Sequence, residues 1–478
     1  MMQAATHNAS SAVAAAVAAI AVFDIGKTNI KLTLVDEHGQ ELAVRRRPNQ
    51  PRQDGPYPHH DVAAIEAWLL ENLAALARQW RIRAIVPVTH GATAALVDEA
   101  GLVLPVADYE HDFALPPAHR PYESLRPPFA QSASPLLGMG LNLGRQLYWQ
   151  SQRYPDAFAR ARYLLMYPQY WSWRLSGVAA GELSSLGCHT DLWQPGQQCY
   201  SSLLAQCNWT PLMPPLRAAW ERLGPLRPEL AQRTGLPADC AVLCGVHDSN
   251  ASLLRYLRGT GGGPRIVLSS GTWLIAAALD GCVSGLREEA DMLANVNVLG
   301  APVACMRFMG GREFAQIAGD DLPCSAEQLQ ALIDAQVFAL PCFSECGGPF
   351  AGRRGSIVGQ APQQPGSRYA LATLYCALMT AYCLDALDAP GEIVVEGSFT
   401  ANPHFAALLA ALVSRTVYRS SDASGTTLGG WLLDRWERAP ETATLPALLP
   451  AEPLALRGLA AYREDWLRKL GELERVAA

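Results

Sequence analysis

The feature that most constrains the fold of this chain is a strand-turn-strand pattern that occurs twice. Apolar residues from Ala21 to Val35 form two predicted strands around a polar turn that contains Gly26. The stretch from Arg265 to Ala278 repeats the arrangement around Gly271, 245 residues later. Because this separation is close to half of the chain, we predict two similar α/β domains, over residues 19–240 and 241–478.

Length and charge limit the classes of function. The chain has 478 residues, of which 50% are hydrophobic, enough for two or three domains that each bury a core. Its 38 basic and 44 acidic side chains give a net charge of −6. The clustered positive charge typical of nucleic-acid or anionic-membrane binding is therefore not expected. We expect a small-molecule partner, no nucleic acid and no membrane.

The cysteines and the first residues indicate a cytoplasmic protein. The twelve cysteines include no Cys-x-x-Cys pair of a zinc ribbon or thioredoxin-like site, so we expect reduced, mostly buried thiols. The apolar run from Ala12 to Phe23 is 12 residues long, shorter than the roughly 20 residues of a membrane span. A signal peptide requires basic residues before its apolar run, and no Lys or Arg precedes this one.

The spacing of apolar residues predicts the main elements. A helix is expected over 61–80, followed by a buried strand over 82–88. In the second half, helices are expected over 368–387, 403–413 and 456–473, and a strand over 392–395.

The first turn, Asp24-Ile-Gly-Lys-Thr-Asn29, has the composition of a phosphate-binding loop. Backbone N–H groups around the glycine, the Thr28 hydroxyl and the Lys27 charge suit a phosphate, and Asp24 could hold Mg²⁺ through water. The alternative is a hairpin that merely tolerates glycine. A Walker A loop is excluded, because Ala21 stands where its first glycine is needed and a strand follows instead of a helix.

The second turn, Leu268-Ser-Ser-Gly-Thr-Trp273, offers two hydroxyl groups and a glycine between strands. Alone, it is best interpreted as a serine-rich β-turn. Together with the first turn, it suggests that two similar loops hold one nucleotide from opposite sides.

The run Gly245-Val-His-Asp-Ser-Asn-Ala251 places Asp248 at a predicted strand-to-helix corner, where ligands meet α/β sheets. A carboxylate there could accept the proton of an attacking hydroxyl group, and it could also cap the helix. Because His247 lies next to Asp248, a hydrolase triad is an alternative interpretation of this run. That alternative is disfavoured because the chain contains no Gly-x-Ser-x-Gly nucleophile elbow.

Two further segments are weaker candidates. His90 ends a predicted buried strand and could face a ligand or simply be a buried histidine. The aromatic stretch from Tyr167 to Gly177, which includes Gln169, is more typical of helix packing than of a sugar platform.

The order of these motifs resembles that of the FGGY carbohydrate kinases along almost the whole chain. The resemblance is carried by Asp-x-Gly-x-Thr, Thr-His-Gly, Tyr-Pro-Gln-Tyr-Trp, His-Asp-Ser, Ser-Ser-Gly-Thr-Trp, Gly-Gly-Arg and Glu-Gly-Ser. It is greatest for the L-fuculose and L-rhamnulose kinase branch, with xylulose kinases as relatives. It implies an α/β fold of two ribonuclease-H-like domains, of the actin and hexokinase type, flanking a central nucleotide and sugar cleft.

The resemblance also implies roles for individual residues. Asp248 matches the catalytic base, and Asp24 and Asp248 match the carboxylates near Mg²⁺. Residues that match sugar contacts are His90, Gly91, Gln169 and Ser249. Residues that match ATP contacts are Gly26, Lys27, Thr28, Asn29, Ser270, Gly271, Thr272, Gly310, Gly311, Gly397, Ser398 and Asn402.

Two segments depart from the family pattern. The adenine-binding segment usually reads Gly-Gly-Gly-Ser-x-Asn, but here it is Glu396-Gly-Ser-Phe-Thr-Ala-Asn402, which leaves the nucleotide preference open. A Lys-Asp-Tyr helix start is replaced by Pro168-Gln169-Tyr170, which removes two charges near the sugar side.

The expected activity is MgATP-dependent phosphorylation of a ketose at a primary hydroxyl group, and the resemblance implies a homodimer. A xylulose, ribulose or polyol kinase is the enzymatic alternative, since His90-Gly91 resembles the His-Gly of xylulose kinases. A sensor that binds sugar and ATP without catalysis, or an actin-like ATPase, is the other alternative. A pure binding protein has no need of a carboxylate base at residue 248.

Overall fold

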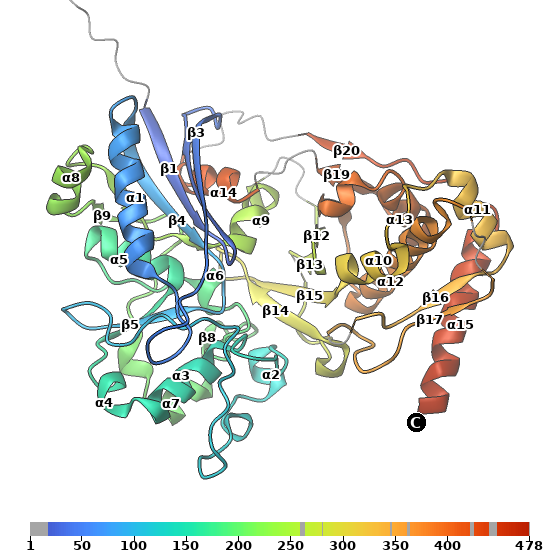
Figure 1. Ribbon diagram of the computed structural model, residues 1–478, viewed down its shortest axis with the longest axis horizontal. Helices are drawn as coiled ribbons and strands as arrows, with labels where there is room; N and C mark the ends of the chain where they lie inside the picture. Colours follow the sequence, from blue (N-terminus) through green and yellow to red (C-terminus); the bar gives the residue numbers. More distant parts are fainter. Residues whose placement is uncertain are drawn as a thin grey trace, which may run out of the picture.

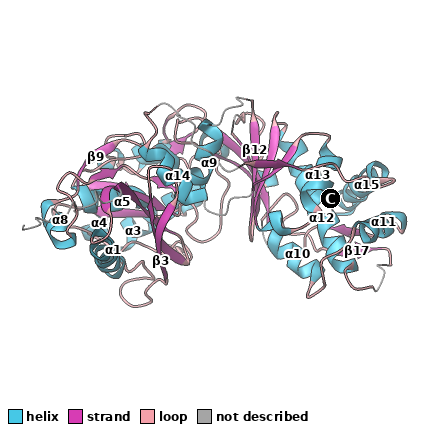
Figure 2. Cartoon of the chain, turned by 90° about the horizontal axis from the view of Figure 1, so that it is seen from above, coloured by secondary structure: helices cyan, strands magenta, loops and turns pink. Residues whose placement is uncertain are grey.

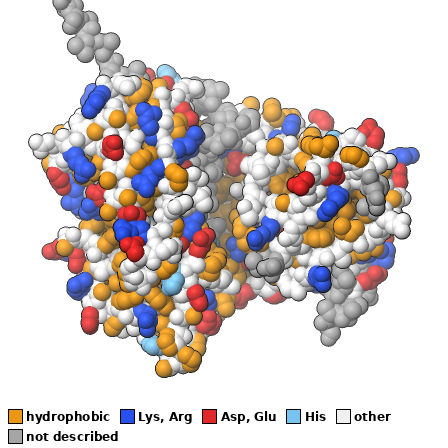
Figure 3. Space-filling view, viewed as in Figure 1, with side chains coloured by type: hydrophobic (Ala, Val, Ile, Leu, Met, Phe, Trp, Pro, Cys, Tyr) orange, Lys and Arg blue, Asp and Glu red, His pale blue; other side chains and the backbone are white. Residues whose placement is uncertain are grey.

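The computed structural model describes residues 18–477 apart from 259–262, 280, 345–346, 361–363, 421–424 and 439–446. The chain forms two lobes, each built around a seven-stranded mixed sheet (Figure 1). A recess separates the lobes on the face drawn in Figure 3. The expected architecture of two α/β domains is confirmed.

The first sheet has the strand order β3-β2-β1-β4-β10-β9, with β11 also paired to β4. Strand β1 runs antiparallel to β2 and parallel to β4, so the first predicted hairpin lies at the centre of the sheet. The strands are β1 (Ala18–Ile25), β2 (Asn29–Val35), β3 (Glu41–Pro48), β4 (Arg81–Thr89), β9 (Arg222–Pro225), β10 (Ala241–Leu243) and β11 (Val246–His247).

Helices cover both faces of this sheet. Alternate residues of a strand point to opposite faces, so Phe23 packs toward one side and Val22 toward the other. The Phe23 side is covered by α1 (Val62–Ala77), α5 (Tyr167–Ser176) and α8 (Pro228–Thr234). The Val22 side is covered by α9 (Asp248–Arg258) and α14 (Gly425–Asp434).

The second sheet has the order β14-β15-β13-β12-β18-β19-β20. Its strands are β12 (Arg265–Ser270), β13 (Leu274–Ala278), β14 (Met292–Val296), β15 (Pro302–Phe308), β18 (Glu392–Gly397), β19 (Val417–Ser420) and β20 (Leu448–Pro450). One face packs against α10 (Gly310–Ala318), α12 (Ser367–Leu387), α13 (Phe405–Val413) and α15 (Leu459–Ala477). The other face is turned toward α9 of the first lobe, where Val267 and Leu253 share a core cluster. Figure 2 shows the two sheets as separate bodies, with α9 between them and β12 beside it.

Helix α14 returns from the second half of the sequence to the first sheet. Its glycines permit this close packing: a Cβ on Gly429 would lie 2.1 Å from the Ala251 carbonyl oxygen, and one on Gly430 would lie 2.7 Å from Val22 Cγ1. At the end of α14, the buried Asp434 carboxylate accepts hydrogen bonds from Arg83 and Arg222 of the first sheet.

The domain boundary expected near residue 240 therefore needs correction. It falls inside the first sheet, because β10 pairs with β4 and β9, and β11 pairs with β4. The range 241–478 is not one structural unit, since α9 and α14 pack on the first sheet. The chain enters the second sheet only after α9.

A mainly helical subdomain extends the first lobe below its sheet (Figure 1). Its elements are β5 (Ala94–Val97), η1 (Tyr122–Ser124), α2 (Phe129–Ser132), α3 (Leu143–Arg153), α4 (Pro155–Phe158), β6 (Tyr163–Met166), α6 (Leu183–Leu186), β7 (Trp193–Gln194), β8 (Cys199–Tyr200), α7 (Ser202–Gln206) and η2 (Thr210–Leu212). The second lobe also contains η3 (Glu288–Ala290), α11 (Ala326–Asp334), β16 (Phe338–Leu340), β17 (Ser356–Val358) and η4 (Ser398–Ala401).

The predicted helices over 61–80, 368–387, 403–413 and 456–473 correspond to α1, α12, α13 and α15, and the strands over 82–88 and 392–395 correspond to β4 and β18. Helix α12 is long and apolar enough to cross a membrane, but most of that stretch is buried inside the second lobe. It is the central core helix of that lobe. Of the cysteines, those within the described residues are free, and most of them are buried.

Candidate active site

The two predicted phosphate turns connect the central strands of the two sheets. In the first turn, the Gly26 N–H donates to the Asn29 carbonyl over 2.9 Å, and the Asn49 side chain donates to the Gly26 carbonyl over 2.8 Å. Thr28 and Asn29 are exposed at the tip, and their side chains are hydrogen-bonded to each other. The turn is therefore rigid in its backbone and open at its tip.

The second turn is built from glycines of three separate segments. Its Gly271 N–H donates to the Trp273 carbonyl over 2.8 Å. A Cβ on Gly311 would lie 2.1 Å from the Gly271 carbonyl oxygen, and one on Gly397 would lie 1.9 Å from the Ser270 carbonyl oxygen. Any larger residue at these positions would displace the turn, so Gly311 and Gly397 act through close backbone packing.

Asp24 is the second-to-last residue of β1, beside the first turn. Its Oδ2 accepts a 2.7 Å hydrogen bond from the Thr426 hydroxyl of α14, and Lys31 Nζ lies 3.9 Å away. Burial raises the pKa of Asp24 to about 6; the Thr426 hydrogen bond opposes the rise, and the negative charge of Asp248 adds to it. The two acidic side chains predicted to lie near a metal ion thus act on each other electrostatically.

Asp248 is the first residue of α9, directly after β11. The Ser249 backbone N–H donates to its Oδ1 over 2.6 Å, and His247 Nε2 lies 3.2 Å from the same oxygen. Burial raises the pKa of Asp248, while the neighbouring His90 and the Ser249 hydrogen bonds oppose the rise. A carboxylate with a raised pKa is a stronger base than a solvent-exposed one.

A cavity of about 150 Å³ collects residues around Asp248 from both lobes. The first lobe supplies the predicted His90, Gly91 and Ser249, and the second lobe supplies side chains of β13, β14 and β15. The lining residues are His90, Gly91, Ala92, Tyr109, Leu141, Cys188, His189, His247, Ser249, Ile275, Leu293, Asn295 and Arg307.

His90 is oriented by its own loop. Its Nδ1 lies 3.0 Å from the Gly91 carbonyl oxygen, and because a carbonyl only accepts, Nδ1 carries the proton. Burial lowers the pKa of His90, so the ring is neutral at pH 7 and Nε2 is an acceptor. Nε2 is buried and has no hydrogen-bond partner within the described residues. A Cβ on Gly91 would approach His247 Nε2 to 2.9 Å, which accounts for glycine at this position.

Lys27 does not extend freely toward a phosphate. Its ammonium group pairs with Asp108 and lies 3.2 Å from Glu110 Oε2, and it stands 4.7 Å from the centre of the Tyr109 ring. Since Tyr109 lines the cavity, Lys27 is closer to the predicted sugar side than its place in the first turn suggests.

Three other predicted contact residues use their side chains within the protein. Gln169 is fully buried and donates to the Cys244 and Gly245 carbonyls, so it supports the bend before Asp248. The Ser270 hydroxyl bridges backbone groups of β18 and η4. Asn402 accepts from backbone N–H groups at the start of α13 and donates to a threonine of α12.

The remaining predicted ATP contacts differ in their exposure. Gly271, Thr272 and Ser398 are exposed, whereas Gly310 is buried at the start of α10 and the Gly311 N–H donates to the Thr272 carbonyl. Sequence reasoning missed the cavity residues Tyr109, Cys188, His189, Asn295 and Arg307. They come from several distant segments, and none belongs to a motif.

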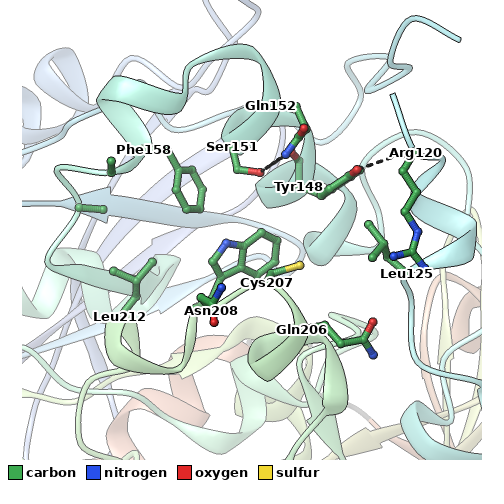
Figure 4. Close-up of a pocket in the computed structure, with 13 residues that line it drawn as sticks. Arg120, Leu125, Tyr148, Ser151, Gln152, Phe158, Gln206, Cys207, Asn208 and Leu212 are labelled. Atoms are coloured by element: carbon green, nitrogen blue, oxygen red, sulfur yellow. Dashed lines mark hydrogen bonds between the residues drawn. The ribbon is translucent and has the colours of Figure 1, made fainter. Parts of the chain in front are cut away.

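A larger cavity of about 480 Å³ lies elsewhere, in the helical subdomain (Figure 4). Tyr148, Ser151 and Gln152 of α3 line one side, and residues between Gln206 and Leu212 line the other. It contains none of the predicted site residues. The smaller cavity is lined by His90 and by both sequence neighbours of Asp248, His247 and Ser249, and it is therefore the candidate active site.

Comparisons with known proteins bear on the family and the fold of the chain. Two family models match: "FGGY family of carbohydrate kinases, N-terminal domain" over residues 19–254, and "Carbohydrate kinase FGGY, C-terminal domain" over residues 262–443. The structure of a carbohydrate kinase from Novosphingobium aromaticivorans is 35% identical with a TM-score of 0.87, and the match covers 94% of this chain and 100% of that one. The xylulose kinase from Lactobacillus acidophilus, at 15% identity and a TM-score of 0.78 over 96% and 98% of the two chains, shares the fold.

Among curated proteins, the L-fuculokinase of Escherichia coli strain K12 is 26% identical over 270 residues. The match covers 54% of this chain and 55% of the relative, so it spans about half of the length of each protein.

Proposed function

The chain belongs to the FGGY family of carbohydrate kinases, and we propose that it transfers the terminal phosphoryl group of ATP to a primary hydroxyl group of a ketose of the L-fuculose or L-rhamnulose type. The observation that carries the proposal is the position of Asp248, a carboxylate of raised pKa between His247 and Ser249, which both line a cavity formed by the two lobes. The similarity to L-fuculokinases supports this substrate type.

In the proposed reaction, Asp248 accepts the proton of the attacking hydroxyl group. The hydroxyl oxygen forms a bond to the γ-phosphorus, the bond from that phosphorus to the bridging oxygen breaks, and ADP leaves with the bridging oxygen. Ser249 and His247 fix the carboxylate against which the hydroxyl group is placed. Because burial lowers the pKa of His247 to about 4, this histidine is neutral at pH 7. It therefore does not neutralise the negative charge of the Asp248 carboxylate.

The exposed tips of the two turns bind the phosphates in this proposal. Thr28 and Thr272 offer hydroxyl groups, and Gly26 and Gly271 allow the backbone to approach closely. The charge of Lys27 is already balanced by Asp108 and Glu110, so most of the charge neutralisation must come from another cation.

Asp24 and Asp248 fit a Mg²⁺ ion. Their oxygen atoms are ligands that Mg²⁺ prefers, and the charge of Asp248 raises the pKa of Asp24, an unfavourable effect that a cation would relieve. In the described part of the chain, no group of three or more His, Cys, Asp or Glu side chains could hold a metal ion alone. These two carboxylates would therefore share the ion with the ATP phosphates, where it would neutralise phosphate charge.

A pentulose kinase is the second candidate. It is favoured by His90 and Gly91, which resemble the His-Gly of xylulose kinases and line the cavity. A purified-protein panel separates the candidates: ADP release with MgATP is measured with L-fuculose, L-rhamnulose, D-xylulose, L-xylulose, D-ribulose and glycerol. Strong stimulation by one 6-deoxyketulose is the expected result. If only a pentulose stimulates ADP release, the protein is a pentulose kinase and the proposed substrate type is wrong. ATP hydrolysis that does not depend on any sugar would favour an actin-like ATPase.

A further inference from the structure

The far wall of the cavity comes from the second lobe. Strand alternation places Asn295 and Leu293 of β14 on one face, together with Arg307 of β15 and its cross-strand partner Ile275 of β13. All four line the cavity that contains His90 and Ser249.

This wall is held firmly against the first lobe. The Ala294 N–H donates to the Ala133 carbonyl over 2.8 Å, and Glu288 accepts from Arg126 and from the Leu136 N–H over 3.0 Å. A Cβ on Gly187 would lie 2.3 Å from Val296 Cγ2, so the two surfaces pack without space between them. The position of Asn295 relative to His90 is thus fixed by several contacts.

The guanidinium group of Arg307 is oriented before any ligand binds. Its Nε and Nη2 donate to the two Asp291 carboxylate oxygens over 3.1 Å each, and the group stands 4.6 Å from the centre of the Trp273 ring. A guanidinium has five N–H donors, and those on Nη1 make no hydrogen bond within the described residues. Arg307 can therefore donate to a ligand without moving.

Two buried acceptors complement this donor. His90 Nε2 and Asn295 Oδ1 are both buried and both without a hydrogen-bond partner in the described part of the chain. A buried polar atom left unpaired costs free energy, so a ligand that donates to these atoms gains more than it would in water. Hydroxyl groups supply such donors.

Charge and volume narrow the ligand further. The positive charge of Arg307 is balanced by Asp291, and that of Lys27 by Asp108 and Glu110, so among the residues that the structure describes neither cation brings an unbalanced charge to the cavity. The cavity volume of about 150 Å³ is close to that of a protein cavity that holds benzene, so the cavity itself has space for about one sugar ring.

We propose that Arg307 and Asn295 determine sugar specificity, and that with His90 they select a neutral monosaccharide over a sugar acid. In this arrangement, sugar hydroxyl groups donate to His90 Nε2 and Asn295 Oδ1, and a sugar oxygen accepts from Arg307. The proposal rests on the proposed kinase function and extends it to the second lobe.

The test compares steady-state kinetics of wild type, Arg307→Met, Asn295→Leu and the control Arg265→Met. Arg265 is matched to Arg307, because it lies in the same sheet, is 13% exposed against 12%, and pairs with a carboxylate, Glu392. The best ketose of the panel and D-gluconate, a sugar acid, serve as substrates. Thermal melting reports whether each variant is folded.

We expect Arg307→Met and Asn295→Leu to raise the KM for the ketose by about ten-fold or more, with the KM for ATP within about two-fold of wild type. Arg265→Met should leave the KM for the ketose and the KM for ATP within about two-fold of wild type. If Arg307→Met does not fold, the KM of Asn295→Leu decides. An active wild type whose sugar KM is unchanged in both variants, or that prefers gluconate, overturns this inference alone. A wild type that phosphorylates no sugar overturns the kinase function and this inference with it.

Discussion

The Thr426 hydroxyl donates a 2.7 Å hydrogen bond to Asp24 Oδ2, although the two residues are 402 positions apart in the sequence. Asp24 lies next to the last residue of β1, and Thr426 lies in α14, which reaches the first sheet from the second half of the chain. The hydrogen bond lowers the pKa of Asp24 against the effect of burial. Helix α14 therefore helps to keep the proposed metal-binding carboxylate ionised.

Replacing Thr426 with valine should raise the pKa of Asp24. Because the proposed site needs an ionised Asp24, we expect the acidic limb of the kcat/KM profile to move upward by roughly one pH unit. Thr426→Ser keeps the hydroxyl group and should keep the wild-type profile. An acidic limb that is identical in the valine variant and wild type would show that Thr426 does not act on the titrating group.

Asp24 should also make the ligand-free protein less stable above its pKa. A carboxyl group whose pKa is raised from 3.8 to about 6 by folding binds more protons in the folded state, so stability falls as pH rises between these values. The difference corresponds to about 3 kcal/mol at most. We expect Asp24→Asn to melt higher than wild type at pH 8, with little difference at pH 4, and to be inactive. Equal melting temperatures at pH 8 would contradict the raised pKa.

The glycines of the second turn should separate into two kinds. Gly397 has φ +80° and its Cβ would lie 1.9 Å from the Ser270 carbonyl oxygen, so Gly397→Ala should cost about 3 kcal/mol or more in unfolding free energy. A Cβ on Gly271 would meet nothing within 4 Å, so Gly271→Ala should leave stability unchanged. If the Gly271 backbone approaches a phosphate, this same variant should raise the KM for ATP.

Urea unfolding and ATP kinetics check both variants. Gly285→Ala is the matched control, since Gly285 is exposed in the same lobe and its Cβ would also meet nothing within 4 Å. If the Gly271→Ala protein is stable and has wild-type ATP kinetics, the second turn is not part of the nucleotide site.

Lys27→Met should affect the sugar more than ATP. Lys27 contacts Asp108, Glu110 and the Tyr109 ring, and Tyr109 lines the cavity. We expect the KM for the sugar to rise several-fold, and the KM for ATP to stay within about two-fold. Lys469→Met is the control, because Lys469 also lies over an aromatic ring, that of Phe338, but on α15. A rise in the KM for ATP alone would contradict this prediction and would show that Lys27 contacts the ATP phosphates instead.

The sequence predicted the paired strand-turn-strand units, because alternating apolar residues and a polar glycine turn are local signals. It also led to Asp24 and Asp248, which stand at the ends of strands, where α/β sites form. The domain boundary could not be predicted, since the return of α14 to the first sheet depends on packing at Gly429 and Gly430. Asn295 and Arg307 were missed for the same reason: strand pairing and lobe contacts bring them to the cavity.

Some predicted contact residues proved to have structural uses. Gln169 and Asn402 carry the polar groups expected of ligand contacts, but the same groups satisfy buried backbone atoms. A motif identifies a residue type at a position. Whether its side chain faces a cavity or a carbonyl group depends on the burial of its neighbours.

The assignment of Asp248 as the base is tested most directly by single-turnover phosphoryl transfer with Asp248→Asn. Asparagine keeps the size of the side chain but cannot accept the proton, so the transfer rate should fall by about 10²–10⁴-fold. ATP and sugar binding, followed by calorimetry, should persist within about ten-fold. An Asp248→Asn protein that phosphorylates the ketose at the wild-type rate would contradict the account.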